Sequence, residues 1–181
     1  MVYQALTLIL LAAAHLHATT VERFSLSQLS AQAHRIIVAT CTGRQTESLD
    51  GQIFTRYTFS VDETVKGNAQ PHIELYLPGG TLEGVQSRIA GMPEFILQSE
   101  HVLFLTEQNH VGFAWPIGLG QGTFRIERTA DNTARVYQRL DGLTLYEQTA
   151  KAAPTPSIQG RELHTFLQTV RTLAGDGPDA R

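Results

Sequence analysis

The chain has 181 residues, with 14 Lys and Arg against 17 Asp and Glu, and its formal net charge is −3 at pH 7. This mildly acidic balance argues against a protein that binds the phosphate backbone of nucleic acids, because such a protein needs a basic face. Cys41 is the single cysteine, which excludes an intramolecular disulfide. The domain must therefore be held together by its apolar core.

Residues 1–18 have the pattern of a signal peptide. They contain no Lys, Arg, Asp or Glu, and residues 5–14 are almost entirely apolar. Small residues mark a cleavage site, which could follow Ala14 or Ala18, and we favour Ala18. The alternative is a buried N-terminal helix; a lasting membrane span is not expected, because polar residues interrupt the run before 20 residues. The segment predicts a periplasmic or secreted bacterial protein.

Residues 19–149 are expected to form one β-rich domain that opens with a short helix. A loose apolar stripe in residues 21–33 indicates that helix, with Ser25 or Ser27 as its N-cap. Residues 36–41 are apolar and β-branched, which is typical of a central strand. Cys41, at their end, is interpreted as a small buried hydrophobe and not as a nucleophile.

The clearest strand is predicted at residues 53–65. Every second side chain from Thr55 to Val61 is suited to a core, and a period of two directs the others to solvent. Residues 72–77 alternate in the same way. Pro78-Gly79-Gly80 ends that strand, because proline cannot donate to the ladder and glycine allows unusual backbone angles.

Further short strands are expected toward the C-terminus, and the pattern places them at residues 85–89, 102–105, 112–115, 124–127 and 135–140. Asp50-Gly51 and Asp131-Asn132 indicate turns between strands. After a linker at residues 150–156, apolar spacings of three and four predict a helix over residues 157–174. Ser157 is its expected cap and Gly175 its expected stop, and residues 175–181 are expected to be a disordered tail.

The even alternation of short strands and turns predicts a mainly β fold. We expect a small antiparallel barrel, OB-like (of the oligonucleotide/oligosaccharide-binding type), or a sandwich, with a short N-terminal helix and a C-terminal helix packed on the domain. Closure of a barrel would leave no strand edge exposed.

The sequence carries none of the motifs that identify common enzyme classes. The glycine-rich run 118–122 is followed by a strand pattern, whereas a phosphate loop needs a helix N-terminus there. The Gly-x-Ser-x-Gly elbow and the His-Glu-x-x-His zinc motif are absent. Asp62 and Glu63 point to opposite faces of a strand and cannot form a glycosidase pair. We therefore expect no enzyme activity, no cofactor and no metal, although His101 and His110 could meet across a hairpin.

Two glycine-rich loops supply the candidate binding residues, and they could lie together at one mouth of a barrel. Those residues are Pro78, Gly79, Gly80, Gly91, Pro93 and Phe95. The hypothesis is an exported binding or accessory module, with another envelope or secreted protein as the expected partner. An exported hydrolase with an unrecognised site, or a peptidase inhibitor, is the alternative.

Short blocks follow one another in a specific order between Ser25 and Val136. They include Ile36-Ile37-Val38, Tyr57-Thr58-Phe59, Val65-Lys66-Gly67, Pro78-Gly79-Gly80, Gly91-Met92-Pro93-Glu94-Phe95, Val102-Leu103-Phe104-Leu105 and Gly120-Gln121-Gly122. This order resembles an uncharacterised family of exported bacterial proteins, in which the Pro-Gly-Gly and Gly-x-Pro-x-Phe blocks are the most specific. The resemblance implies export and assigns no activity.

A strand that ends near Val65-Lys66-Gly67, with a later apolar strand at residues 102–105, is also similar to the netrin-like barrel of tissue inhibitors of metalloproteinases. That resemblance implies an OB-type barrel. Two differences separate the chains: Ser99-Glu100 stands where those inhibitors have a Gly-Glu turn, and this chain lacks their N-terminal cysteine. None of their inhibitory residues is therefore carried over, since fold similarity does not give function.

Overall fold

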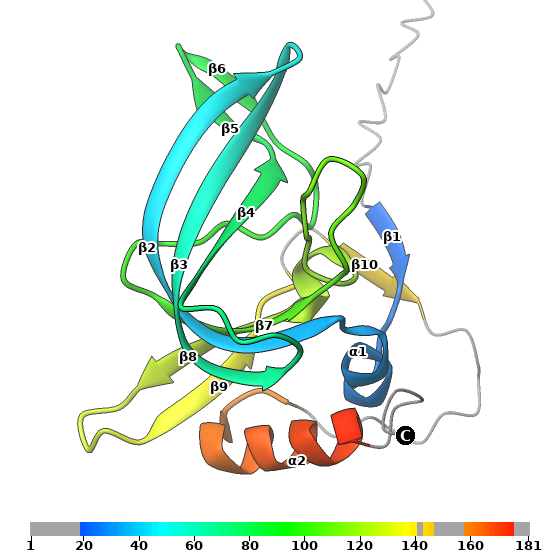
Figure 1. Ribbon diagram of the computed structural model, residues 1–181, viewed down its shortest axis with the longest axis vertical. Coiled ribbons are helices and arrows are strands. Elements are labelled where there is room, and N and C mark those ends of the chain that lie inside the picture. Colours follow the sequence, from blue (N-terminus) through cyan, green and yellow to red (C-terminus); the bar gives the residue numbers. More distant parts are fainter. Residues whose placement is uncertain (1–18, 141–142, 147–157, 176–181) are drawn as a thin grey trace, which may run out of the picture.

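A computed structural model describes residues 19–140, 143–146 and 158–175 (Figure 1). Its helices are α1 (Leu26–Gln32), the short 3-10 helix η1 (Leu119–Gly122) and α2 (Leu163–Gly175). Its strands are β1 (Thr19–Glu22), β2 (Arg35–Leu49), β3 (Gln52–Lys66), β4 (His72–Pro78), β5 (Gly80–Leu82), β6 (Val85–Ser87), β7 (Glu100–Leu105), β8 (Thr123–Arg128), β9 (Ala134–Gln138), β10 (Leu143–Tyr146) and β11 (Arg161–Glu162). The prediction of a mainly antiparallel β fold with a helix toward each end is confirmed.

The main sheet has seven antiparallel strands in the order β11-β9-β8-β7-β2-β3-β4. It is not closed, so β11 and β4 are its edges and the complete barrel of the expectation does not form in the described residues. Two small sheets accompany it: β1 pairs with β10 in parallel, and β5 pairs with β6. Helices cover one face of the main sheet and an irregular segment covers the other. The apolar side chains of both faces are therefore buried although the sheet does not close into a barrel.

A long hairpin of β2 and β3 dominates the sheet and curves away from the helices in Figure 1. The expected strand at residues 36–41 continues to Leu49, because its polar second half still pairs with β3. Asp50 and Gly51 make the turn with φ of 51° and 76°. Positive φ at both central residues is typical of a type I′ hairpin turn. Register shifts at three places in β2 mark bulges, which bend a strand.

The first half of β2 is buried on both faces, which explains its unbroken apolar run. On one face Ile36 and Val38 join residues of β7, β8 and β9 in a core covered by α1 and α2. On the other face Ile37 and Cys41 join residues of β3, β4 and β7 in a second core. Cys41 is fully buried, and burial raises the pKa of its thiol, as suits a buried hydrophobe.

The N-terminal helix begins where the sequence predicts. Ser25 is its N-cap: the Ser25 side chain accepts from the Gln28 N–H, and the Gln28 side chain accepts from the Ser25 N–H. This reciprocal capping box stabilises the first turn. Before the helix, Gln121 holds the incoming chain, because its side-chain amide accepts from the Phe24 N–H and donates to the Glu22 carbonyl.

Several predicted boundaries are wrong. Residues 112–115 form no strand, because the Asn109 side chain accepts from the N–H groups of Val111 and Phe113 and folds the chain into a turn. Strand β6 ends at Ser87, two residues before the predicted end. The C-terminal helix begins at Leu163, since the two preceding residues pair with β9, and it includes Gly175.

The remaining predicted segments lie outside the described residues. These are the signal peptide at residues 1–18, the linker at residues 150–156 with the cap Ser157, and the tail from residue 176. Strand β1 begins at Thr19, directly after the first of them.

Residues 88–99, here called the covering segment, cross the second core without regular structure and are anchored there by Phe95. The Phe95 ring is 1% exposed and meets the rings of Tyr57 and Phe59 edge-on, with centroids 5.0 Å apart in each case. Farther along, the Gln98 N–H donates to the Cys41 carbonyl at 2.7 Å. Phe95 is therefore a core residue, although the sequence analysis placed it in a binding loop.

We expect Phe95→Ala to lower the free energy of unfolding by about 3–5 kcal/mol, because it removes a buried ring and leaves a cavity. Leu97→Ala is the matched control in the same segment, since Leu97 is 52% exposed, and its cost should stay within about 0.5 kcal/mol. Urea denaturation measures both. Equal losses for the two variants would contradict an anchoring role for Phe95.

Candidate functional site

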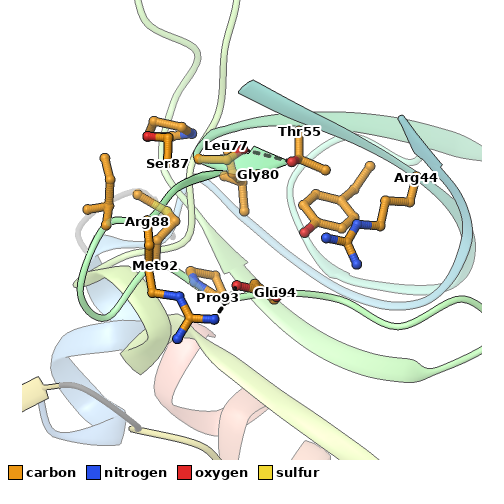
Figure 2. Close-up of a pocket in the computed structure, with 13 residues that line it drawn as sticks. Arg44, Thr55, Leu77, Gly80, Ser87, Arg88, Met92, Pro93 and Glu94 are labelled. Carbon is orange, nitrogen blue, oxygen red and sulfur yellow. Dashed lines mark hydrogen bonds and ion pairs between the residues drawn. The ribbon is translucent and has the colours of Figure 1, made fainter. Parts of the chain in front are cut away.

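The structure brings the two predicted loops together. Pro78, Gly79 and Gly80 lie opposite Pro93 around a small hollow, whose other side chains include Arg44 (Figure 2). The Thr55 hydroxyl closes one wall by donating to the Gly79 carbonyl at 2.7 Å. The volume of the hollow is about 20 Å³, which suits about one water molecule. A small-molecule ligand therefore needs a different site.

The local structure explains why two positions of these loops are glycine. Gly80 has φ of 134°, and a Cβ there would lie 2.4 Å from Thr55 Oγ1. Gly91 has φ of 78°, and its Cβ would lie 2.0 Å from Leu143 Cδ2. The positive φ favours glycine at both positions, and at Gly80 the hydrogen-bonded Thr55 hydroxyl also leaves no room for a Cβ. The loops therefore carry glycine for local structure, whatever they bind.

A larger cavity of about 450 Å³, here called the main cavity, lies between the covering segment and the sheet. It includes Gly91, Pro93 and Phe95 of the predicted set and none of residues 78–80. Its full lining comprises residues 88–96, Ser99, His101, Gly120, Thr123, Arg125 and Arg139. Of the last six, the sequence suggested a chemical role only for His101, as a metal-ligand candidate, and for Gly120, in a glycine-rich run that was rejected as a phosphate loop.

Strand register explains how the polar part of the lining is assembled. His101 on β7 lies directly opposite Arg125 on β8, so both side chains stand on the same face of the sheet. Thr123 precedes Arg125 by two residues and shares that face. The intervening Phe124 points the other way, into the core beneath the helices. Alternation along one strand thus gives the helices an apolar face and the main cavity a polar one.

His101 is the most perturbed group of the site. It is 6% exposed, and its Nε2 lies 2.8 Å from the Ser99 hydroxyl oxygen. The same hydroxyl donates to the Ile96 carbonyl. His101 Nδ1 is buried and has no hydrogen-bond partner in the structure. Burial, aided by the positive charge of Arg125, lowers the pKa of His101 to about 4, so the imidazole is neutral at pH 7.

This arrangement is poorly suited to general-base catalysis. A serine–histidine pair is activated when a third group orients the base, and no described carboxylate hydrogen-bonds to His101. A base that works near neutral pH also needs a pKa near 7, well above that of His101.

Within the described ranges, no group of three or more His, Cys, Asp or Glu residues could hold a metal ion. The same part of the chain contains no helix that is long and apolar enough to cross a membrane. Comparison with protein families, with curated proteins and with solved structures gives no match to this chain. The resemblances to exported bacterial proteins and to netrin-like barrels therefore stay predictions.

We expect the free energy of unfolding to fall as the pH drops from about 6.5 to about 4. Over this range His101 takes up a proton in the unfolded chain but stays neutral in the folded protein, which favours unfolding. Above pH 6.5 the imidazole is neutral in both states, so it causes no loss of stability there. The loss over the window is on the order of 3 kcal/mol. Urea denaturation at several pH values should show a shallower slope for His101→Gln, and parallel slopes would contradict the assignment.

Proposed function

We propose that the protein is an exported, non-enzymatic binding module that takes a small organic ligand into the main cavity. The observation that carries this proposal is the cavity itself, about 450 Å³ between the covering segment and β7–β8. Ligand pockets usually measure about 300–1,000 Å³ and combine apolar walls with a few convergent polar groups. This cavity has both features.

The chemistry of the lining supports an amphiphilic ligand. Ile89, Met92 and Ile96 of the covering segment offer apolar surface. Facing them, the sheet offers hydroxyl, imidazole and guanidinium groups. Ile96 is 63% exposed, so apolar surface remains at the rim for a ligand to cover.

An exported hydrolase is the second candidate, and the contact between Ser99 and His101 is the observation in its favour. The missing carboxylate partner and the depressed pKa of His101 weigh against it. Failure of a fluorophosphonate probe to label Ser99 would support the binding module, and specific labelling would favour the hydrolase. The peptidase-inhibitor alternative has only the netrin-like resemblance behind it.

Filling the main cavity should abolish binding. Ala90→Trp adds a large ring to the cavity lining, and we expect it to weaken binding of the neutral dye phenylnaphthylamine at least tenfold, measured by fluorescence titration. Ala130→Trp, in an exposed turn outside the cavity, is the matched control and should bind as the wild type does. Unchanged binding by Ala90→Trp, or no binding by the wild type, would contradict the proposed function.

Export rests on residues 1–18 and on where the described fold begins. Strand β1 starts at Thr19 and pairs with β10 over four residues, so cleavage after Ala18 would leave the described fold intact. Expressed with its own N-terminus in a bacterium, the protein should be recovered from the periplasm or medium with Thr19 as its first residue. Mass spectrometry of the purified protein tests this, and an intact N-terminus on cytoplasmic protein would contradict it.

A further inference from the structure

Arg125 projects into the main cavity without a hydrogen-bonded partner. Its Nε is buried and makes no hydrogen bond, and its ion pair with Glu127 Oε1, at 3.7 Å, is too long for one. The side chain is 34% exposed, so its guanidinium is reachable by a ligand. Buried polar groups in folded proteins are nearly always satisfied, and an orphaned one at a cavity wall points to a missing partner.

Arginines outnumber carboxylates in the lining of the main cavity. Arg88, Arg125 and Arg139 belong to it, and Glu94 is its one carboxylate. Glu94 pairs with Arg88 at 3.8 Å at the outer rim, where both side chains are more than half exposed. Of these arginines, Arg125 is the one on the sheet that faces the cavity beside His101.

The nearby carboxylate of Glu100 is already engaged. Arg128 binds both of its oxygens, with distances of 2.9 Å and 2.6 Å. Glu100 precedes His101 on β7, so its side chain points to the opposite face of the sheet and does not balance Arg125. Arg125 therefore has the long ion pair with Glu127 but no hydrogen-bonded partner, and its guanidinium can still donate to a ligand.

We propose that the ligand of the main cavity is an organic anion, with its acidic group on the Arg125 guanidinium and its apolar body against Met92 and Ile96. This inference rests on the proposed function and adds the chemical class of the ligand. Ser99 and neutral His101 supply uncharged polar contacts beside the acidic group. A guanidinium can donate two parallel hydrogen bonds to a carboxylate, sulfonate or phosphate, which gives orientation as well as affinity.

Two dyes that share one ring system test the inference. Anilinonaphthalene sulfonate carries a sulfonate, and phenylnaphthylamine lacks it. We expect the wild-type protein to bind the sulfonated dye about tenfold more tightly, as one charge-assisted contact allows. Arg125→Gln should remove this preference, because it weakens binding of the sulfonated dye about tenfold more than binding of the neutral dye. Arg125→Lys, which keeps the charge without the planar fork, should retain part of the preference.

Arg35→Gln is the matched control, because Arg35 lies outside the cavity and donates to Gln70 at 2.7 Å. It should bind both dyes as the wild type does, which separates a cavity effect from a change in net charge. Raising the salt concentration should weaken the sulfonated dye selectively. Thermal unfolding of each variant confirms that the fold persists.

The outcomes separate the two proposals. Equal affinity for both dyes, or a uniform loss of both in Arg125→Gln, would overturn the anion inference and leave the binding function standing. Dyes that fail to bind the wild type, or that bind Ala90→Trp normally, would overturn the binding function itself. A preference for the sulfonated dye that is lost in Arg125→Gln and kept in Arg35→Gln supports both the binding function and the anion inference.

Discussion

Burial of the sheet on both faces is the constraint on which the rest of this structure depends. Residues 36–39 of β2 and residues 102–105 of β7 are nearly inaccessible to solvent, so each face of these strands must be covered. On one face α1 and α2 do this with apolar side chains that pack against β7, β8 and β9. The sheet has seven strands and does not close, so no opposing wall of a barrel serves the other face.

The second face is covered by an irregular chain, and the main cavity is the consequence. A helix presents a regular apolar stripe, whereas the covering segment touches the core mainly through Phe95 and Met92. Side chains on either side of Phe95 turn outward, and the chain returns to the sheet only near Ser99. The space left between these contacts is wide enough to admit a ligand. The function that we propose thus follows from how this face is covered.

The charged and polar side chains on the sheet side of the main cavity determine its electrostatic properties. A neutral imidazole and a guanidinium stand side by side across β7 and β8, and the positive charge of Arg125 helps to keep His101 unprotonated. An arginine that satisfied its donors within the protein would leave nothing for a ligand to complete. The main cavity therefore has an apolar side on the covering segment and a polar side on the sheet, which carries Arg125.

The sequence by itself determined the local elements. The alternation in β3 and β4, the Ser25 cap and the Asp50-Gly51 turn depend on residues a few positions apart, and each was predicted. Tertiary structure alone decided the extension of β2 to Leu49, the pairing of β1 with β10, and the meeting of His101 with Arg125. These three features depend on contacts between residues far apart in the sequence. A polar strand or an irregular segment has no hydrophobic periodicity from which its pairing partner could be predicted. The candidate loops were found because glycine marks tight turns, but the cavity lining was missed because strand register, which no local pattern reveals, assembles it.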